Sequence, residues 1–133
     1  MKTIKTSEAT LPQIDWLVAK CEIEGKPHEI TFGQYGGGGL CIHVHPTNPL
    51  LDGRKMLMEP STNWAQGGPI IEREGITIAP HSTENGVITS WKAGRDWPMS
   101  HFPFYLGDTP LVAAMRMFVT YKLGDSVEVP DEL

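Results

Sequence analysis

The sequence predicts an α+β domain in which a small, mainly antiparallel sheet is accompanied by a helix near each end of the chain and one short central helix. Two segments of helical apolar spacing, near residues 10–21 and 109–124, lie on either side of short segments of alternating polarity. The chain has 133 residues, the usual size of one domain, so we expect residues 1–133 to form a single unit. An apolar share of 40% is sufficient for a core and excludes an intrinsically disordered chain.

The first helix is expected from Thr10 to Cys21. Thr10 is a suitable N-cap, and Pro12 is tolerated in the first turn because the amide it lacks would have no partner within the helix. Gly25 lies just beyond the expected C-terminal end of this helix. One apolar face is formed by Ile14, Leu17, Val18 and Cys21.

Short strands are expected in the middle of the chain. Residues 29–32 favour a strand, the four glycines 36–39 predict a loop, and residues 40–45 alternate with the period of a half-buried strand. Residues 54–58 predict another short strand. Residues 76–79 and 86–92 predict an antiparallel hairpin whose turn contains Asn85 and Gly86.

The central helix is expected to begin near Pro69 and to end at Gly75. Residues 93–107 show no clear period and predict a long aromatic loop. The last helix is capped by Asp108 or Thr109 and stopped by Gly124. Residues 125–133 predict an extended tail that lies on the body.

The charge and the cysteine content narrow the functional classes. Eleven basic and sixteen acidic residues give a net charge of −5, which argues against general binding to a nucleic-acid backbone. The apolar runs are shorter than a membrane-spanning helix and the first residues are not signal-like, so we expect a soluble protein without a membrane partner. Two cysteines are too few for a disulfide framework and fit a reducing compartment.

A candidate metal site is formed by Cys41, His43 and His45, which emerge on one face of one strand. Cysteine and histidine are good zinc or copper ligands. A fourth ligand could come from elsewhere in the chain: His28, His81 or His101. The favoured alternative is a solvated strand face without metal, since a closed site needs four satisfied ligands.

An anion site is a second candidate, at the start of the central helix. Gly67 and Gly68 follow Asn63 and Trp64, and unpaired amides at a helix start attract anions. The segment is not a phosphate-binding loop, because Pro69 and its neighbours replace the lysine and hydroxyl of that motif. The alternative is a tight turn held by Trp64 in the core.

Aromatic and cationic side chains are interleaved in a third segment. Flat rings beside cations suit a nucleobase and its phosphates, although rings of this kind also fill space under a loop. The aromatic members are Trp91, Trp97, Phe102, Phe104 and Tyr105, and the polar ones are Lys92, Arg95 and His101. Nucleophilic catalysis is poorly supported, since no nucleophile elbow is present and Glu72 and Glu74 point in different directions on a helix.

Five sequence blocks resemble the NinX family of small proteins from lambdoid bacteriophages and prophages. They are KTSE at residues 5–8, IDWLVA at 14–19, STNWAQGGPIIE at 61–72, TPLVAAMR at 109–116 and LGDSVEVP at 123–130. Residues 24–58 and 80–107 depart from the family pattern. The resemblance implies a phage origin and expression in the cytoplasm of a bacterial host, but it implies no active site.

The favoured hypothesis is a non-enzymatic accessory protein that sequesters a small anionic ligand, such as a nucleotide-derived signal of host defence. The family blocks bring together two helix starts, near Gly68 and Thr109, with Trp64 and Arg116, and we expect these to converge on one pocket. In this hypothesis glycine amides bind phosphate, an arginine pairs with charge, and a tryptophan stacks on a base. The predicted ligand-binding residues are Asn63, Trp64, Gly67, Gly68, Trp91, Arg95, Trp97, Thr109 and Arg116.

Two other hypotheses stay open. One is an inhibitor that binds a host protein through the aromatic loop. The other is a small nucleotide hydrolase or a metal-dependent enzyme. No cofactor is expected, and a homodimer is the default expectation, because a chain of this size often completes a pocket with a second copy.

Overall fold

A computed structural model describes residues 1–47, 54–95 and 103–133, and it confirms the α+β class. Three helices and eight strands are present in these residues, together with one short 3-10 segment. Along the chain they are β1 (Lys2–Lys5), η1 (Thr6–Glu8), α1 (Leu11–Glu22), β2 (His28–Gln34), β3 (Leu40–Pro46), β4 (Met56–Met58), α2 (Trp64–Glu74), β5 (Thr77–Glu84), β6 (Val87–Gly94), β7 (Tyr105–Gly107), α3 (Pro110–Leu123) and β8 (Ser126–Val129).

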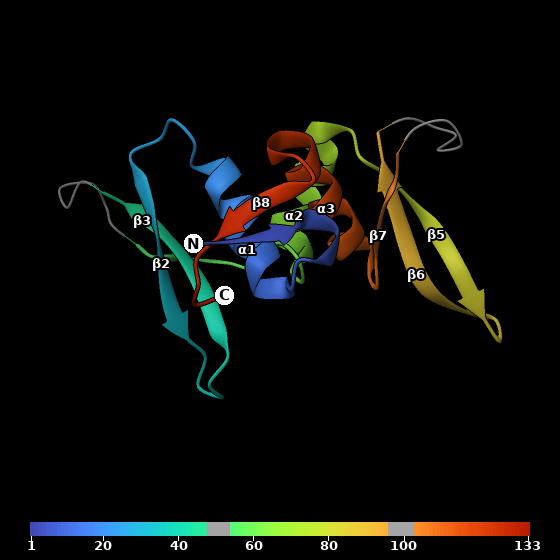
Figure 1. The fold of residues 1–133 in the computed structure, drawn as a ribbon, viewed down its shortest axis with the longest axis horizontal. Coiled ribbons are helices and arrows are strands. Elements are labelled where there is room, and N and C mark those ends of the chain that lie inside the picture. Colours follow the sequence, from blue (N-terminus) through green and yellow to red (C-terminus); the bar gives the residue numbers. More distant parts are fainter. Residues whose placement is uncertain (48–53, 96–102) are drawn as a thin grey trace.

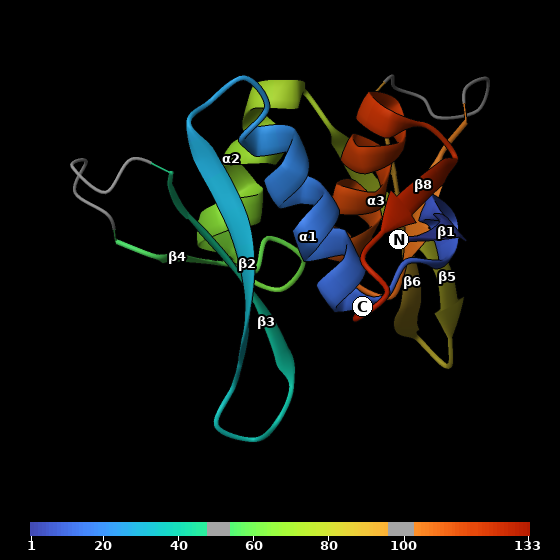
Figure 2. The same ribbon diagram turned by 60° about the vertical axis from the view of Figure 1, so that its left-hand side comes forward.

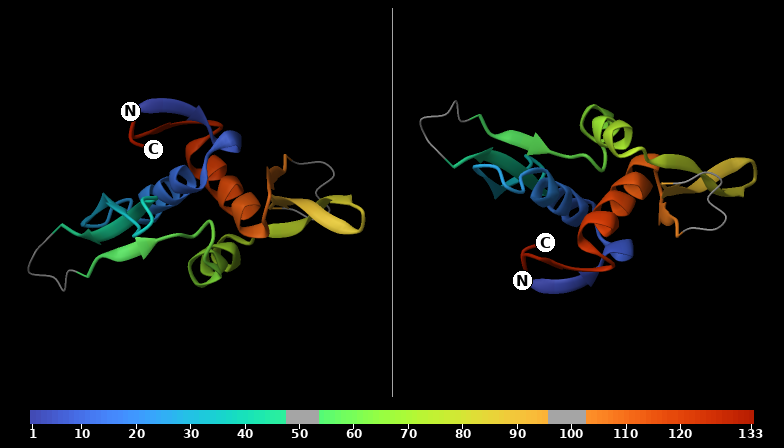
Figure 3. Two further views of the ribbon diagram at one scale, coloured as in Figure 1. Left: turned by 90° about the horizontal axis from the view of Figure 1, so that it is seen from below. Right: turned by 90° about the horizontal axis from the view of Figure 1, so that it is seen from above.

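The helices occupy the centre of the molecule and the sheets surround them (Figure 1). The sheet β2-β3-β4 lies at one end, and the sheet β5-β6-β7 lies at the other. Figure 3 shows the two-stranded ribbon β1-β8 on one side of α1 and α3, with α2 on the opposite side. All strand pairs are antiparallel, as predicted, but they form three small sheets rather than one.

The core is centred on α1 and α3, whose apolar faces pack against each other. Leu17 of α1 and Met115 of α3 are completely buried, and Phe118 of α3 is nearly so. Gly107 at the end of β7 lies so close to α3 that a Cβ there would collide with the amide nitrogen of Ala113. The absence of a side chain at Gly107 therefore lets β7 pack against the helix.

The expected first and last helices are confirmed. At the start of α1, the Gln13 side-chain oxygen accepts a hydrogen bond from the Thr10 amide at 2.9 Å. The side-chain nitrogen of Gln13 donates to the carbonyl of Leu133 at 2.8 Å, which ties the C-terminus to α1. At α3, the Thr109 hydroxyl accepts from the amide of Val112 at 3.1 Å, and Gly124 follows the last helical residue.

The extended tail predicted at residues 125–133 is confirmed for Ser126–Val129, which form strand β8, whereas residues 130–133 form a turn in which the Leu133 amide donates to the Pro130 carbonyl at 3.1 Å. Its partner β1 was not predicted, because the polar residues Lys2, Thr3 and Lys5 give that short segment no clear strand pattern. Val127 and Val129 of β8 are buried, so the pairing with β1 completes one wall of the core.

The β2-β3 hairpin is confirmed and extends well beyond the helices (Figure 2). Its turn contains the four glycines, and Gly38 has a φ of +92°, which favours glycine. The β5-β6 hairpin is also confirmed, with Asn85 and Gly86 at positive φ in its turn. The aromatic loop predicted at residues 93–107 is wrong at both ends, because Ala93 and Gly94 belong to β6 and Tyr105–Gly107 form β7. Residues 96–102 of that loop lie outside the described residues.

The central helix begins at Trp64, five residues before the predicted start at Pro69. The side-chain oxygen of Asn63 accepts a hydrogen bond from the Ala65 amide at 2.9 Å and so provides the N-cap. Gly67 and Gly68 suggested a loop, but both are helical, and Pro69 follows within the first two turns. Gly75, with a φ of +63°, ends the helix as predicted.

Within the three described ranges, no helix combines the length and the apolar character that crossing a membrane requires.

Candidate functional site

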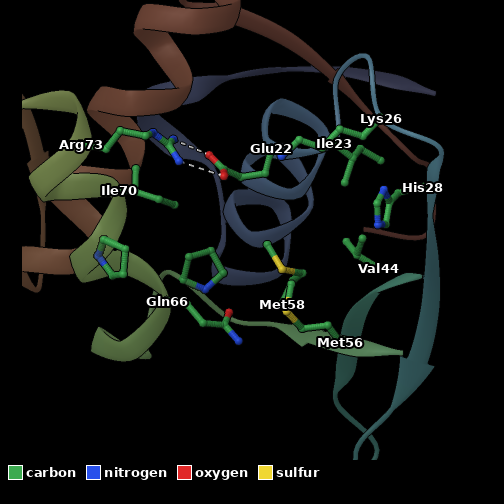
Figure 4. A pocket seen from close by; sticks show the side chains of 12 residues that line it. Glu22, Ile23, Lys26, His28, Val44, Met56, Met58, Gln66, Ile70 and Arg73 are labelled. Carbon is green, nitrogen blue, oxygen red and sulfur yellow. Dashed lines mark hydrogen bonds and ion pairs between the residues drawn. The ribbon is translucent and has the colours of Figure 1, made fainter. Parts of the chain in front are cut away.

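An apolar cleft of about 350 Å³ lies between the helical centre and the β2-β3-β4 sheet. Figure 4 shows α2 on one side of it, the strands on the other, and the last turn of α1 between them. The lining residues are Glu22, Ile23, Lys26, His28, Val44, Met56, Met58, Pro60, Gln66, Pro69, Ile70 and Arg73. The volume and the lining, apolar with a few polar groups, are those of a small-molecule site.

The floor of the cleft is built by three buried side chains from three elements. Val44 of β3, Met58 of β4 and Ile70 of α2 are 5%, 6% and 4% exposed. Met56 stands at the edge and is 54% exposed. Methionine is flexible and polarisable, so these two thioethers can adapt to a flat ring.

The rim of the cleft carries more positive than negative groups. Lys26 and Arg73 are cationic, and Glu22 is the only carboxylate among the lining residues. Arg73 donates to both oxygens of Glu22, at 3.1 Å and 2.5 Å, across the top of the cleft (Figure 4). This pairing raises the pKa of the Arg73 guanidinium, which therefore stays charged.

The turn after α1 places Lys26 and His28 at the rim. Gly25 adopts a φ of +73°, which lets the chain reverse directly after the helix. The Lys26 amide then donates to the Ile23 carbonyl at 2.9 Å, and the His28 amide donates to the Lys26 carbonyl at 2.8 Å. His28 thus begins β2 with its ring in the cleft (Figure 4).

His28 and Gln66 differ in how far their polar atoms are already used. The Nδ1 atom of His28 is buried and has no hydrogen-bond partner among the described residues. Gln66, by contrast, donates to the Leu57 carbonyl at 2.6 Å and accepts from the Glu59 amide at 2.7 Å. Gln66 therefore holds β4 against α2, whereas His28 keeps hydrogen-bonding capacity for a ligand.

The structure brings together only part of the predicted site. Trp64 and Thr109 meet at a separate hollow of about 210 Å³, which Leu11, Ser61 and Thr62 also line. Trp64 is 56% exposed, so the alternative that it sits in the core is wrong. Asn63 acts as the N-cap of α2 and does not line the hollow.

The predicted anion site at Gly67 and Gly68 is contradicted by the position of the helix start. Because α2 begins at Trp64, the Gly67 amide donates to the Asn63 carbonyl at 2.9 Å and is not available to a phosphate. A Cβ at Gly67 would lie 2.5 Å from Cδ2 of Leu111 and 2.7 Å from the Pro60 carbonyl oxygen. Gly67 therefore allows α2 to pack closely against α3.

Arg116 does not join Trp64 and Thr109. Its guanidinium donates to the carbonyls of Leu106 at 3.0 Å and Ala9 at 2.8 Å. Burial lowers the pKa of this guanidinium. Arg116 lines a different hollow, next to Tyr105. The predicted convergence of Arg116 and Gly68 with Trp64 and Thr109 is wrong, because Arg116 binds the carbonyls of Leu106 and Ala9, and Gly68 does not line the hollow where Trp64 and Thr109 meet.

The aromatic and cationic candidates are brought together only in part: the Lys92 ammonium lies 5.4 Å from the centre of the Phe104 ring. Arg95 stacks on the Tyr121 ring at 3.8 Å, donates to its hydroxyl at 2.7 Å and forms an ion pair with Glu74 at 3.4 Å. Trp91 packs against the core from β6. Trp97 lies outside the described residues.

Cys41, His43 and His45 do share one face of β3, opposite Gly33, Thr31 and Glu29 of β2. Cys41 is buried, and the two histidines are half-buried. In residues 1–47, 54–95 and 103–133, no three metal-binding side chains come close enough to hold an ion. His45 instead lies 3.4 Å from the Glu29 carboxylate, while His81 packs on the Phe104 ring and His101 lies outside the described residues.

The sequence reasoning missed most of the cleft. His28 was considered only as a fourth metal ligand, and Lys26 was not considered. Arg73 was not considered as a site residue, although it reaches Glu22 on another helix. Alternating apolar residues at 42 and 44 beside the short strand at 54–58 were the available signal for the floor, but nothing in the sequence placed α2 opposite them.

The fold and the cleft together define a small α+β protein with a concave, ligand-sized surface. The chain belongs to the family described as Bacteriophage P22, NinX, whose family model matches residues 5–122. A search of curated proteins finds no match. The match therefore establishes the phage family and leaves the biochemical activity to be inferred from the site.

Proposed function

We propose that this protein is a phage accessory protein that binds and sequesters a small anionic ligand with a flat apolar part in the cleft between α2 and the β2-β3-β4 sheet. A nucleotide-derived signal of host defence in the bacterial cytoplasm has this chemistry. The single observation that supports the proposal most strongly is the combination of an apolar floor with a rim that carries Lys26, His28 and Arg73.

The two parts of the ligand would use different parts of the cleft. A base would lie on Val44, Met58 and Ile70, where burial of apolar area contributes about 25 cal/mol per Å² before the cost of binding is subtracted. A phosphate would lie at the rim, next to Lys26 and the unpartnered Nδ1 of His28. Arg73 already shares its charge with Glu22, so Lys26 carries the freer positive charge.

Binding without catalysis is supported by the chemistry of the rim. The lining residues include no hydroxyl or thiol nucleophile, and the carboxylate of Glu22 is held by Arg73. Sequestration requires only affinity and sufficient protein, which suits a small product of a phage gene.

A depletion assay tests the proposal. The purified protein is incubated with linear and cyclic nucleotides and filtered, and the free species are quantified before and after the protein is heated. The expected result is that one species disappears and returns intact on heating, and the amount removed gives the ratio of ligand to chain. New products would identify an enzyme instead.

Variants then locate the binding site. Lys26→Gln should weaken binding of the identified nucleotide by about tenfold or more, as expected for loss of a charged hydrogen bond. Lys2→Gln, on the exposed strand β1, removes the same charge far from the cleft and should leave the affinity unchanged. Equal affinity in the Lys26 variant and the wild type would exclude this cleft as the site.

A host-protein inhibitor is the second candidate. It is favoured by exposed apolar side chains at the end of the aromatic segment, where Phe104 is 39% and Leu106 is 42% exposed. Two results together would support it. The depletion assay would remove no nucleotide, and a pull-down from host lysate would recover one stoichiometric host protein on the wild-type chain but not on the Leu106→Asp variant.

A further inference from the structure

Another cavity, of about 270 Å³, lies near the start of α1, between that helix, the end of the β2-β3 hairpin and the turn before α2. Its lining is mostly apolar, with one carboxyl, one phenol, one hydroxyl and one thiol. The residues are Leu11, Pro12, Asp15, Tyr35, Gly39, Leu40, Cys41, Ile42, Met58 and Thr62.

Asp15 is the most deeply placed polar group of this cavity. The residue is 8% exposed, and one carboxyl oxygen accepts a hydrogen bond from the Ser61 amide at 2.9 Å. No basic side chain forms an ion pair with it in the part of the chain that the structure describes. A carboxylate in such a place needs a cation when it ionises, because burial without a partner is costly.

The surroundings of Asp15 add negative rather than positive potential. Glu59, in the turn before α2, accepts hydrogen bonds from the Tyr35 hydroxyl at 3.2 Å and from the Asn63 side chain at 3.3 Å. None of the cavity-lining residues is lysine, arginine or histidine. The charge pattern is therefore opposite to that of the cleft with Lys26 and Arg73.

We infer that this cavity binds a small organic cation, a primary alkylammonium group whose charge pairs with Asp15 and whose alkyl chain lies against Leu40, Ile42 and Met58. A metal ion fits less well, because the apolar lining offers few further oxygen ligands. The volume suits a chain of a few carbons. This site is distinct from the proposed anion cleft, although Met58 lines both.

Binding of the cation is coupled to the protonation of Asp15. Burial raises the pKa of the Asp15 carboxyl to about 6, against the lowering effect of its hydrogen bond from Ser61, and the charge of Glu59 adds to the rise. The other titratable groups near it are Tyr35 and Cys41 of the hairpin. Because an ammonium pairs with the ionised form, affinity should rise with pH through this pKa and then level off.

Calorimetric titration of the full chain with n-butylammonium tests the inference, with n-butanol as the neutral analogue of the same shape. The expected result is saturable binding of the ammonium that is about tenfold weaker near pH 5 than near pH 8, since about a tenth of Asp15 is ionised at the lower pH. Nearly one proton should be released per bound ammonium near pH 5 and almost none near pH 8. The number released is obtained by comparing the binding enthalpy in two buffers of different ionisation enthalpy.

Asp15→Asn keeps an oxygen for the Ser61 amide but removes the charge, and it should abolish ammonium binding. Glu72→Gln removes one exposed carboxylate from α2 and should bind as the wild type does. If the Asp15→Asn substitution prevents folding, proton release by the wild-type protein decides the question alone. Equal binding of butanol, binding without proton release, or an Asp15 variant that binds normally would each overturn the inference.

Discussion

The carboxyl of Asp15 on α1 accepts a hydrogen bond at 2.9 Å from the amide of Ser61, a residue 46 positions further along the chain. Both residues are buried, so this contact joins the first helix to the turn that leads into α2. The same turn holds Glu59, whose charge opposes the ionisation of Asp15. This hydrogen bond thus holds the turn against α1, while burial, the largest cause, raises the pKa of the Asp15 carboxyl.

The stability of the protein should depend on pH through Asp15. The pKa of this carboxyl rises from 3.8 to about 6 on folding, so between these values the folded chain binds a proton that the unfolded chain releases. The free energy of unfolding should therefore fall as pH rises through this range, by up to about 3 kcal/mol. Urea unfolding near pH 4 and near pH 8 measures it.

The matched variants isolate this contribution. Asp15→Asn should lose less stability than the wild type over the same pH range, since its amide does not ionise, whereas Glu72→Gln should follow the wild type. If the free energy of unfolding changed with pH in the same way in the wild type and in the Asp15 variant, burial would not raise the pKa of this carboxyl.

Adjacent glycines in α2 should respond in opposite ways to alanine. A Cβ at Gly67 would lie 2.5 Å from Leu111 and 2.7 Å from the Pro60 carbonyl, so Gly67→Ala should destabilise the protein by about 1 to 3 kcal/mol. At Gly68 nothing lies within 4 Å of the new Cβ, so Gly68→Ala should stabilise it by up to about 1 kcal/mol. Thermal unfolding of both variants measures the difference, and equal effects would contradict the packing described for α2.

Arg116 should be a structural residue. Arg116→Met removes the donors to the carbonyls of Leu106 and Ala9 and should cost about 2 to 3 kcal/mol of unfolding free energy, the range for hydrogen bonds from charged groups. Arg54→Met, at an exposed position, should change stability by less than about 0.5 kcal/mol. Chemical denaturation compares the two, and a stable Arg116 variant that has lost nucleotide binding would restore the original expectation for this residue.

The N-cap of α3 should contribute measurably to stability. Thr109→Ala removes the oxygen that accepts from the Val112 amide at 3.1 Å and should cost about 1 kcal/mol. Thr109→Ser keeps that oxygen and should stay close to the wild type. Thermal unfolding of the pair separates capping from the loss of a methyl group, because both variants lack it.

The fold was predictable where local signals are strong. Thr10, Thr109 and Gly124 mark helix boundaries by capping chemistry, and Asn85-Gly86 specifies a tight hairpin turn. The start of α2 was misplaced because a helix that contains two glycines and a proline has weak intrinsic propensity. Its position depends on the Asn63 cap and on contact with α3, which only the assembled chain provides.

The candidate site was predictable only in small part. Trp64 and Thr109 do meet, because the two helix starts lie side by side against Leu11. Arg116, Arg95 and Gly67 have residue types suited to anion binding, but carbonyls, a phenol, a carboxylate or the helix itself already use most of their hydrogen-bonding groups. Among the described residues, the Nε atom of Arg116 is buried without a partner. A sequence gives the type of a polar group and not whether folding has given it a partner.

By itself, the sequence determined the α+β class, the first and last helices, the hairpins and the phage family, since these depend on periodicity, capping residues and recurring blocks. The tertiary structure alone decided that strands β1 and β8 pair across the whole chain, that α2 faces β3 and β4 across a cleft, and that Asp15 is buried beside Ser61 without a cation among the described residues. These features depend on packing between distant segments. The burial of a charge and the shape of a cleft arise only when those segments meet.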